Sequence, residues 1–145
     1  MKTLLILFLA LTFQSVAFGQ KSEVFVAGGK AIAGYDPVAY FTEKKPVMGK
    51  PEFKLEYQGA VWYFSSEANK KLFQANPNTY APQYGGYCAF GAAGGYKAKI
   101  SPDAWAIVNN KLYLNYDQNV QMDWIKDKEA LIKKADSNWP AIKKN

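Results

Sequence analysis

The sequence predicts a single α+β domain in which two β-hairpins form a small antiparallel sheet with helices packed on it. Two tight turns predict the hairpins, at Gln58-Gly59 and at Asn109-Asn110, each between apolar or alternating segments. Apolar residues at helical spacing follow each hairpin. No internal repeat or linker divides the chain, so we expect one domain over residues 20–145 with its core at residues 34–140.

Residues 1–19 are expected to be a secretory signal peptide that is cleaved off. Lys2 supplies the positive charge at the start, and residues 4–13 are almost all apolar. Ala17 and Gly19 are small residues at positions −3 and −1 relative to the expected cleavage site. The apolar run is shorter than the roughly 20 residues that span a bilayer, which argues against an uncleaved anchor. We therefore expect an exported protein, periplasmic or secreted, with no later membrane span.

The first half of the mature chain is expected to hold an edge strand, a turn, a hairpin and a helix. The strand is expected at residues 24–27, and the turn at Asp36, because a residue before proline is kept out of the helical region. Residues 53–57 alternate apolar and polar, as a half-buried strand does, and residues 60–64 return. Ser65 or Ser66 caps the helix that follows, and Asn76-Pro77 stops it.

The second half begins with a glycine-rich stretch, residues 85–95, which we expect to be a loop carrying Cys88. The second hairpin pairs residues 104–108 with residues 111–116, and its two asparagines tolerate the positive φ that such turns need. The remainder is expected to be helical as far as Trp139-Pro140, where the ordered part ends.

Composition excludes several classes of function. The chain has no histidine, so it offers neither a Ser-His nor a Cys-His catalytic pair. Every basic residue is lysine, and arginine is the residue that grips phosphates and base edges bidentately. Nucleic acid is therefore not an expected partner, and the net charge of +6 is attributed to a solvated lysine surface. A single cysteine excludes an internal disulfide.

Several motifs together resemble the YHS domain family. They are Tyr35-Asp36-Pro37-Val38, the strand and cap Trp62-Tyr63-Phe64-Ser65-Ser66, the helix end Leu72-Phe73-Gln74-Ala75-Asn76-Pro77, and Tyr80. Further motifs resemble an exported branch of that family: Tyr84-Gly85-Gly86-Tyr87-Cys88-Ala89, Ala104-Trp105, Leu112-Tyr113-Leu114-Asn115-Tyr116, Trp124 and Asn138-Trp139-Pro140. The resemblance spans nearly the whole mature chain and implies a binding module of the YHS type.

The resemblance has two implications for chemistry. Family members are regarded as metal binders that use cysteines, but here Ala39, Ser65 and Asn69 stand at those places, so the usual metal site is not carried over. Relatives of the exported branch sometimes have selenocysteine at the position of Cys88, which implies redox or soft-metal chemistry there.

Cys88 is therefore the candidate reactive residue, with a buried, inert thiol as the alternative. A redox role would need an external reductant, because the chain has no Cys-x-x-Cys pair. A soft metal such as copper would need Cys88 together with Met48 or Met122, and Cys88 is the only candidate metal ligand of the thiol kind.

The tyrosines and glycines around Cys88 suggest a pocket for a small ligand, although core packing and a turn role for the aspartate are the competing interpretations. The candidate ligand-binding residues are Tyr35, Asp36, Tyr84, Gly85, Gly86, Tyr87 and Phe90. The sequence thus favours a non-enzymatic binding or sensing module for a soft metal or small ligand, centred on the Cys88 loop. The alternatives are a thiol-dependent redox enzyme and an accessory protein that docks on an envelope partner.

Overall fold

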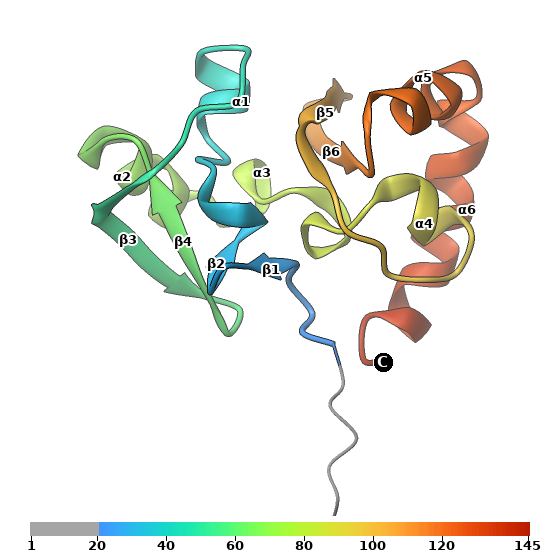
Figure 1. The fold of residues 1–145 in the computed structure, drawn as a ribbon, viewed down its shortest axis with the longest axis horizontal. Helices are drawn as coiled ribbons and strands as arrows, with labels where there is room; N and C mark the ends of the chain where they lie inside the picture. The colour runs from blue at the N-terminus through green and yellow to red at the C-terminus, as the bar shows by residue number, and fades with distance from the viewer. Residues whose placement is uncertain (1–20) are drawn as a thin grey trace, which may run out of the picture.

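The computed structural model describes residues 21–145, so the expected signal peptide lies outside the described residues. The described part has an α+β fold, as predicted, with helices packed around three two-stranded antiparallel sheets (Figure 1). Both predicted hairpins are present, but they remain separate sheets and do not pair with each other. Within residues 21–145, no helix combines the length and apolar character needed to cross a bilayer.

The first hairpin joins β3 (Lys50–Tyr57) to β4 (Ala60–Phe64). Its turn residues Gln58 and Gly59 have φ values of 50° and 72°, the left-handed pair that a two-residue hairpin turn needs. Residues of β4 alternate between buried and half-buried, because one face of the hairpin covers a core.

Two helices follow this hairpin. Ser66 caps α2 (Glu67–Ala75), its hydroxyl accepting a hydrogen bond from the backbone N–H of Asn69 at 3.1 Å. Pro77 separates α2 from α3 (Pro77–Tyr80). It lacks the backbone N–H that would continue α2, but proline is well suited to the first turn of a helix and therefore begins α3.

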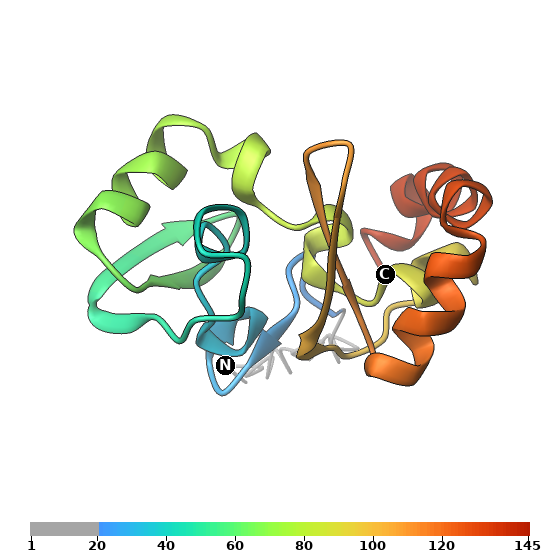
Figure 2. The ribbon, with the colours of Figure 1, turned by 90° about the horizontal axis from the view of Figure 1, so that it is seen from above.

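The second hairpin, β5 (Ser101–Val108) and β6 (Lys111–Asn115), stands between two hydrophobic cores. Leu112 and Leu114 of β6 belong to the first core, whereas Tyr113 belongs to the second. Because successive side chains of a strand point to opposite faces, both faces of β6 are buried. Figure 2 shows this hairpin standing between the two halves of the molecule. The second hairpin contacts the two cores through the faces of its strands, and its edges do not pair with the first hairpin.

The first core lies under β3, β4 and α2, and the second lies among the C-terminal helices. Large buried side chains of the first core are Tyr40, Trp62, Phe64 and Phe73. Those of the second are Tyr84, Tyr113 and Trp124. Two cores that share a strand favour one cooperative domain over two independent ones.

The N-terminal segment lies across the junction of the two halves. The expected edge strand is shorter than predicted: β1 (Val26–Ala27) pairs with β2 (Lys30–Ala31) in a small hairpin of its own. The 3₁₀ turn η1 (Ile32–Gly34) and the short helix α1 (Ala39–Thr42) follow and lead to β3.

Two expectations for the second half need correction. The glycine-rich stretch is not all loop: it includes the end of η2 (Gln83–Gly86) and the whole of the short helix α4 (Ala89–Ala93), which buries small residues against α6. The C-terminal region forms two helices, α5 (Gln118–Lys126) and α6 (Lys128–Ile142).

Helix α6 also continues through Pro140 rather than ending there. The Trp139 carbonyl accepts the Lys143 N–H at 2.8 Å, so the final turn closes in spite of the proline. The ring of Trp139 packs near the rings of Tyr84 and Tyr87, which anchors this turn to the rest of the fold.

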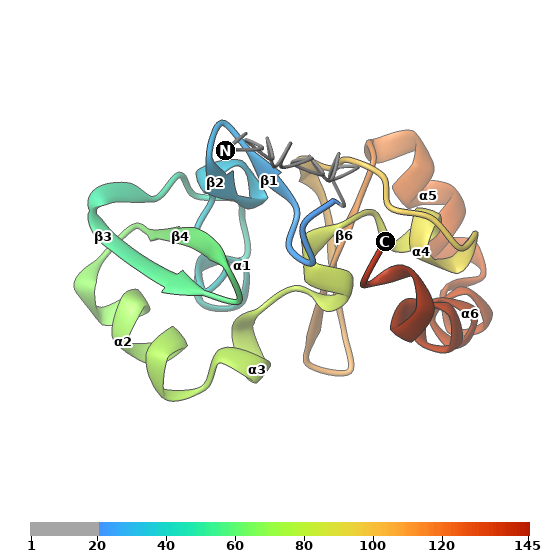
Figure 3. The same cartoon turned by 90° about the horizontal axis from the view of Figure 1, so that it is seen from below.

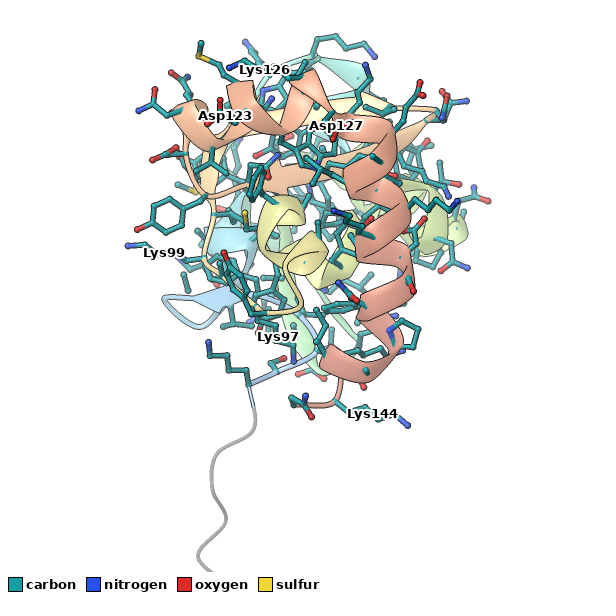
Figure 4. The ribbon with its side chains drawn as sticks, turned by 90° about the vertical axis from the view of Figure 1, so that its right-hand side faces the viewer. Lys97, Lys99, Asp123, Lys126, Asp127 and Lys144 are labelled. Atoms are coloured by element: carbon teal, nitrogen blue, oxygen red, sulfur yellow. The ribbon has the colours of Figure 1, made fainter. Side chains whose placement is uncertain are left out.

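Lys97 connects the two ends of the described chain. Its ammonium donates to the backbone carbonyls of Lys21, Lys143 and Asn145 at 3.2, 2.9 and 2.8 Å. It also lies over the rings of Tyr87 and Trp139. The residue is only 8 % exposed, and burial lowers the pKa of its amine. Figure 4 shows Lys97 near the start of the described chain, and Figure 3 shows the C-terminal turn of α6 beside the centre of the molecule.

Candidate functional site

Cys88 is sealed inside the fold. The residue is 2 % exposed, and its backbone is held by a bridge to Leu114 and by a 3.0 Å hydrogen bond from its N–H to the carbonyl of Ala98. The thiol caps α4, accepting from the N–H of Gly91 at 3.5 Å, and donates to Oδ1 of Asn115 at 3.5 Å. These contacts hold the sulfur on the inner side of α4.

Burial also determines the protonation of this sulfur. Desolvation raises the pKa of the Cys88 thiol, outweighing the backbone N–H groups of Gly91, Tyr116 and Phe90 that lower it. The neutral thiol is therefore the stable form at neutral pH. A thiolate, which is the form that attacks disulfides and binds metals, is disfavoured in this environment.

The proposed partners for a soft metal lie elsewhere. Met48 and Met122 are 53 % and 61 % exposed, the first beside Tyr35 and the second on α5. Among residues 21–145 there is no group of three or more His, Cys, Asp or Glu side chains placed to hold a metal ion. The structure therefore gives no support to a copper site built on Cys88.

Asp36 is fully buried and its carboxylate accepts five hydrogen bonds. Oδ1 receives the backbone N–H groups of Val38 and Ala39 at 2.8 and 3.3 Å. Oδ2 receives the N–H and hydroxyl of Ser65 at 2.8 and 2.7 Å, and the side-chain amide of Asn69 at 2.7 Å. The aspartate thereby joins the turn before α1 to the cap of α2.

The three positions at which the family resemblance places cysteines, Ala39, Ser65 and Asn69, are thus brought together around one carboxylate. They do not fit a thiolate metal site. Ala39 offers no side-chain donor, and Ser65 and Asn69 direct their hydrogens at Asp36. The hydrogen bonds of Asp36 occupy the place where such ligands would meet, and they join α1 to the start of α2.

The glycines beside Cys88 make close contacts with the protein itself. A Cβ on Gly85, whose φ is +63°, would lie 1.9 Å from the carbonyl oxygen of Glu23. One on Gly86, whose φ is +85°, would lie 2.5 Å from a side-chain methyl of Ile32. Glycine is required here because the N-terminal segment packs directly on this turn.

The aromatic candidates divide between different environments. The hydroxyl of Tyr84 donates to Asp136 at 2.9 Å, and burial is the main cause that raises the pKa of Tyr84. The hydroxyl of Tyr87 donates to the carbonyl of Ser22 at 2.6 Å. Phe90 is exposed on α4, and Tyr35 is half-buried beside Met48.

The predicted ligand residues consequently do not form one pocket. Tyr84 and Gly85 line one cleft, and Tyr87 lines a separate cavity with Lys97. The other candidates, Tyr35, Asp36, Gly86 and Phe90, line neither of these two.

The cleft that contains Tyr84 lies where the N-terminal segment, the β3–β4 turn, the α3–η2 connection and the end of α6 meet. Its volume is about 270 Å³. Its aromatic walls are Tyr57, Trp62, Tyr84 and Trp139. Its polar lining consists of the amides of Gln58, Asn78 and Gln83 and of the charged pair Glu23 and Lys143; Ala81, Pro82 and Gly85 complete it.

Packing fixes the walls of this inter-half cleft. The indole N–H of Trp62 donates to the carbonyl of Tyr57 at 3.0 Å, which ties β4 to the end of β3. The rings of Tyr84 and Trp139 lie 6.0 Å apart, edge to face. The cleft therefore has a rigid aromatic base, whereas Gln58 and Asn78 are exposed at its rim.

Most residues of this cleft were not predicted from the sequence as functional. The sequence predicts Gln58 only as a turn residue and the lysines only as a solvated surface. Four segments distant in the chain supply the lining, and no local pattern brings them together. Among the residues that line the cleft, only Tyr84 and Gly85 belong to the predicted ligand-binding residues.

Comparison with known proteins identifies one part of the chain. Residues 38–84 match the family model of the YHS domain, which is less than half of the chain. The search of curated proteins and that of solved structures gave no match. The matched range runs from the start of α1 through the first hairpin, α2 and α3 to Tyr84 at the cleft. Residues 38–84 of this chain are therefore similar to the YHS domain, the family that its motifs resemble.

Proposed function

We propose that the protein is an exported, non-enzymatic binding module that holds a small ligand between its YHS domain and its C-terminal half. One observation carries the proposal: the inter-half cleft joins residues of both parts around aromatic walls and solvent-facing amides. Ligand sites are common at such junctions, and they combine apolar walls with a few polar groups. Export rests on the apolar N-terminal pattern and its small-residue cleavage site.

The environment of Cys88 favours this cleft over a thiol-centred function. A redox thiol needs to be reachable and to ionise near neutral pH. Cys88 is 2 % exposed, and burial raises the pKa of its thiol. We therefore place the binding function on the Tyr84 side of the same turn and assign Cys88 to the packing of α4.

A thermal-shift and tryptophan-fluorescence titration tests this proposal, because Trp62 and Trp139 both line the cleft. The probes are neutral disaccharides, nucleosides, dipeptides and aromatic carboxylates. A ligand that binds only the folded state stabilises it by about 2.7 kcal/mol at about 100 times its Kd, which raises Tm measurably. We expect at least one class to shift both signals.

Two variants locate the response. Gln83→Trp fills the cleft and is expected to abolish the shift, while Cys88→Ala leaves it in place. Circular dichroism and Tm without probe establish that both variants fold. No shift with any class, or a shift lost in Cys88→Ala but kept in Gln83→Trp, would overturn the proposal.

A further inference from the structure

The charges of the inter-half cleft do not select a charged ligand. Its two ionic side chains are Glu23 and Lys143, which have opposite signs and lie 3.9 Å apart. They offset each other, so a charged ligand gains little net attraction from them. The lysines 21, 97 and 99 line a different cavity. The chemistry of the cleft is therefore that of a neutral binding site.

The polar lining presents amides from three separate segments. Gln58 belongs to the hairpin turn, Asn78 to α3, and Gln83 to η2. Each amide offers both donor hydrogens and an acceptor oxygen. A hydroxyl group likewise donates one hydrogen bond and accepts others. A ligand with several hydroxyl groups can therefore pair with such amides, whereas an apolar ligand would bury them without partners.

The aromatic lining complements a ring with apolar faces. Tyr57 and Trp139 are half-buried, so part of each ring remains open to solvent, whereas Trp62 and Tyr84 form the deeper base. Such rings bind the C–H face of a saturated ring by dispersion and burial. A volume of about 270 Å³ lies just below the usual range of ligand sites, roughly 300–1,000 Å³, which suits roughly one ring inside the cleft with the rest of a longer ligand in solvent.

From this combination we infer that the cleft binds a neutral saccharide, with one sugar ring against Tyr57 and Trp139 and its hydroxyl groups on the amides of Gln58, Asn78 and Gln83. The inference rests on the proposed function and specifies its ligand class. Hydroxyl groups and C–H faces on one small ring are the features that match this mixture of amides, aromatic rings and mutually neutralised charges.

The test is a fluorescence titration of the full chain with cellobiose, maltose and N,N′-diacetylchitobiose as neutral probes. Glucuronic acid, adenosine and glycyl-tyrosine are the charged, nucleoside and dipeptide comparisons. Gln83→Leu removes one amide at nearly constant size, and Gln74→Leu on the exposed side of α2 is the matched control. We expect at least one neutral disaccharide to bind, with affinity about fivefold weaker in Gln83→Leu and changed less than twofold in Gln74→Leu, since each lost hydrogen bond costs roughly 1 kcal/mol.

The outcomes separate the ligand class from the site itself. If adenosine or glycyl-tyrosine binds instead, and Gln83→Leu weakens it, the saccharide inference is overturned while the cleft stands as a ligand site. Disaccharide binding that Gln83→Leu leaves unchanged places the sugar elsewhere and overturns the inference. If the neutral disaccharides alone fail to bind, the inference falls; if none of these probes and no aromatic carboxylate binds, the proposed function falls as well. Tyr57→Leu gives a second variant, expected to weaken the sugar, should Gln83→Leu fail to fold.

Discussion

Asp36→Asn removes the charge at the centre of the network that joins α1 to α2, with almost no change in volume. Two oxygens of the buried carboxylate accept five hydrogen bonds. An asparagine amide has only one acceptor oxygen, and its NH₂ group must replace the other. If the NH₂ replaces Oδ1, it faces the N–H groups of Val38 and Ala39; if it replaces Oδ2, it faces the N–H of Ser65.

The magnitude follows from counting donors left without an acceptor. Rotation of the Ser65 hydroxyl and a flip of the Asn69 amide can relieve two of the three contacts at Oδ2. At least one buried backbone N–H remains unpaired, which costs about 1–3 kcal/mol. The hydrogen bonds that survive lose their charge-assisted strength as well. We therefore expect a loss of about 3 kcal/mol, or about 10 °C in Tm for a domain of this size.

Urea unfolding followed by circular dichroism measures this loss. Asp103→Asn, the same change at an exposed position of β5, is the control and should stay within about 0.5 kcal/mol of the parent. Chelator should leave the unfolding midpoint of the parent protein unchanged, because the network contains no thiolate ligands. A loss below about 1 kcal/mol in Asp36→Asn, or a midpoint that chelator lowers, would refute a structural role for this carboxylate.

Three further predictions concern the turn and the buried groups around it. Gly85→Ala should destabilise the protein by more than about 2 kcal/mol, about twice as much as Gly59→Ala. Both glycines have positive φ, but of the two only Gly85 lies against a backbone oxygen of another segment. The urea unfolding midpoints of the two variants measure the difference. The free energy of unfolding should fall as pH rises from about 8.5, because burial raises the pKa of the Cys88 thiol and the folded protein keeps a proton that the unfolded chain releases. Cys88→Ala should show a shallower fall, and equal slopes of stability against pH in the two proteins would contradict the prediction. Lys97→Met keeps the aliphatic stem but loses three hydrogen bonds to carbonyls, so we expect a loss of about 2–3 kcal/mol and faster carboxypeptidase trimming.

The local elements were largely predictable because their causes are local. Gln58-Gly59 and Asn109-Asn110 can both adopt positive φ, and this property alone locates the two hairpins. Ser66 caps α2 for a similar reason, since its hydroxyl needs only the N–H three residues later. The α+β class follows from these elements without any knowledge of how they pack.

The arrangement of the hairpins and the helical part of the glycine-rich stretch depend on distant partners. Nothing near Leu112, Tyr113 and Leu114 indicates that one strand serves two cores. Helix α4 is rich in alanine and glycine, and it is stabilised by close packing on α6 rather than by its own sequence pattern. Helix α6 continues past Pro140 because its last turn is anchored by Trp139 and Lys97.

The candidate site was predictable only in part for the same reason. The motif around Cys88 predicts a loop with a ligand pocket, and two of the predicted ligand residues, Tyr84 and Gly85, line the cleft. Whether the sulfur faced the cleft or the interior depended on α4 and Asn115, which the sequence alone could not position. The amides of the cleft come from Gln58, Asn78 and Gln83, which lie in short turns and helices, and nothing in their local sequence indicates a binding role.

The most direct test of the account is an NMR titration of isotope-labelled protein with the disaccharide that binds best. The account predicts that amide shifts change at Gln58, Asn78, Gln83 and Gly85 and at the side-chain N–H of Trp62 and Trp139, while Cys88 and its α4 neighbours stay unchanged. Shifts confined to the Cys88 and α4 region, with the cleft residues unaffected, would contradict it.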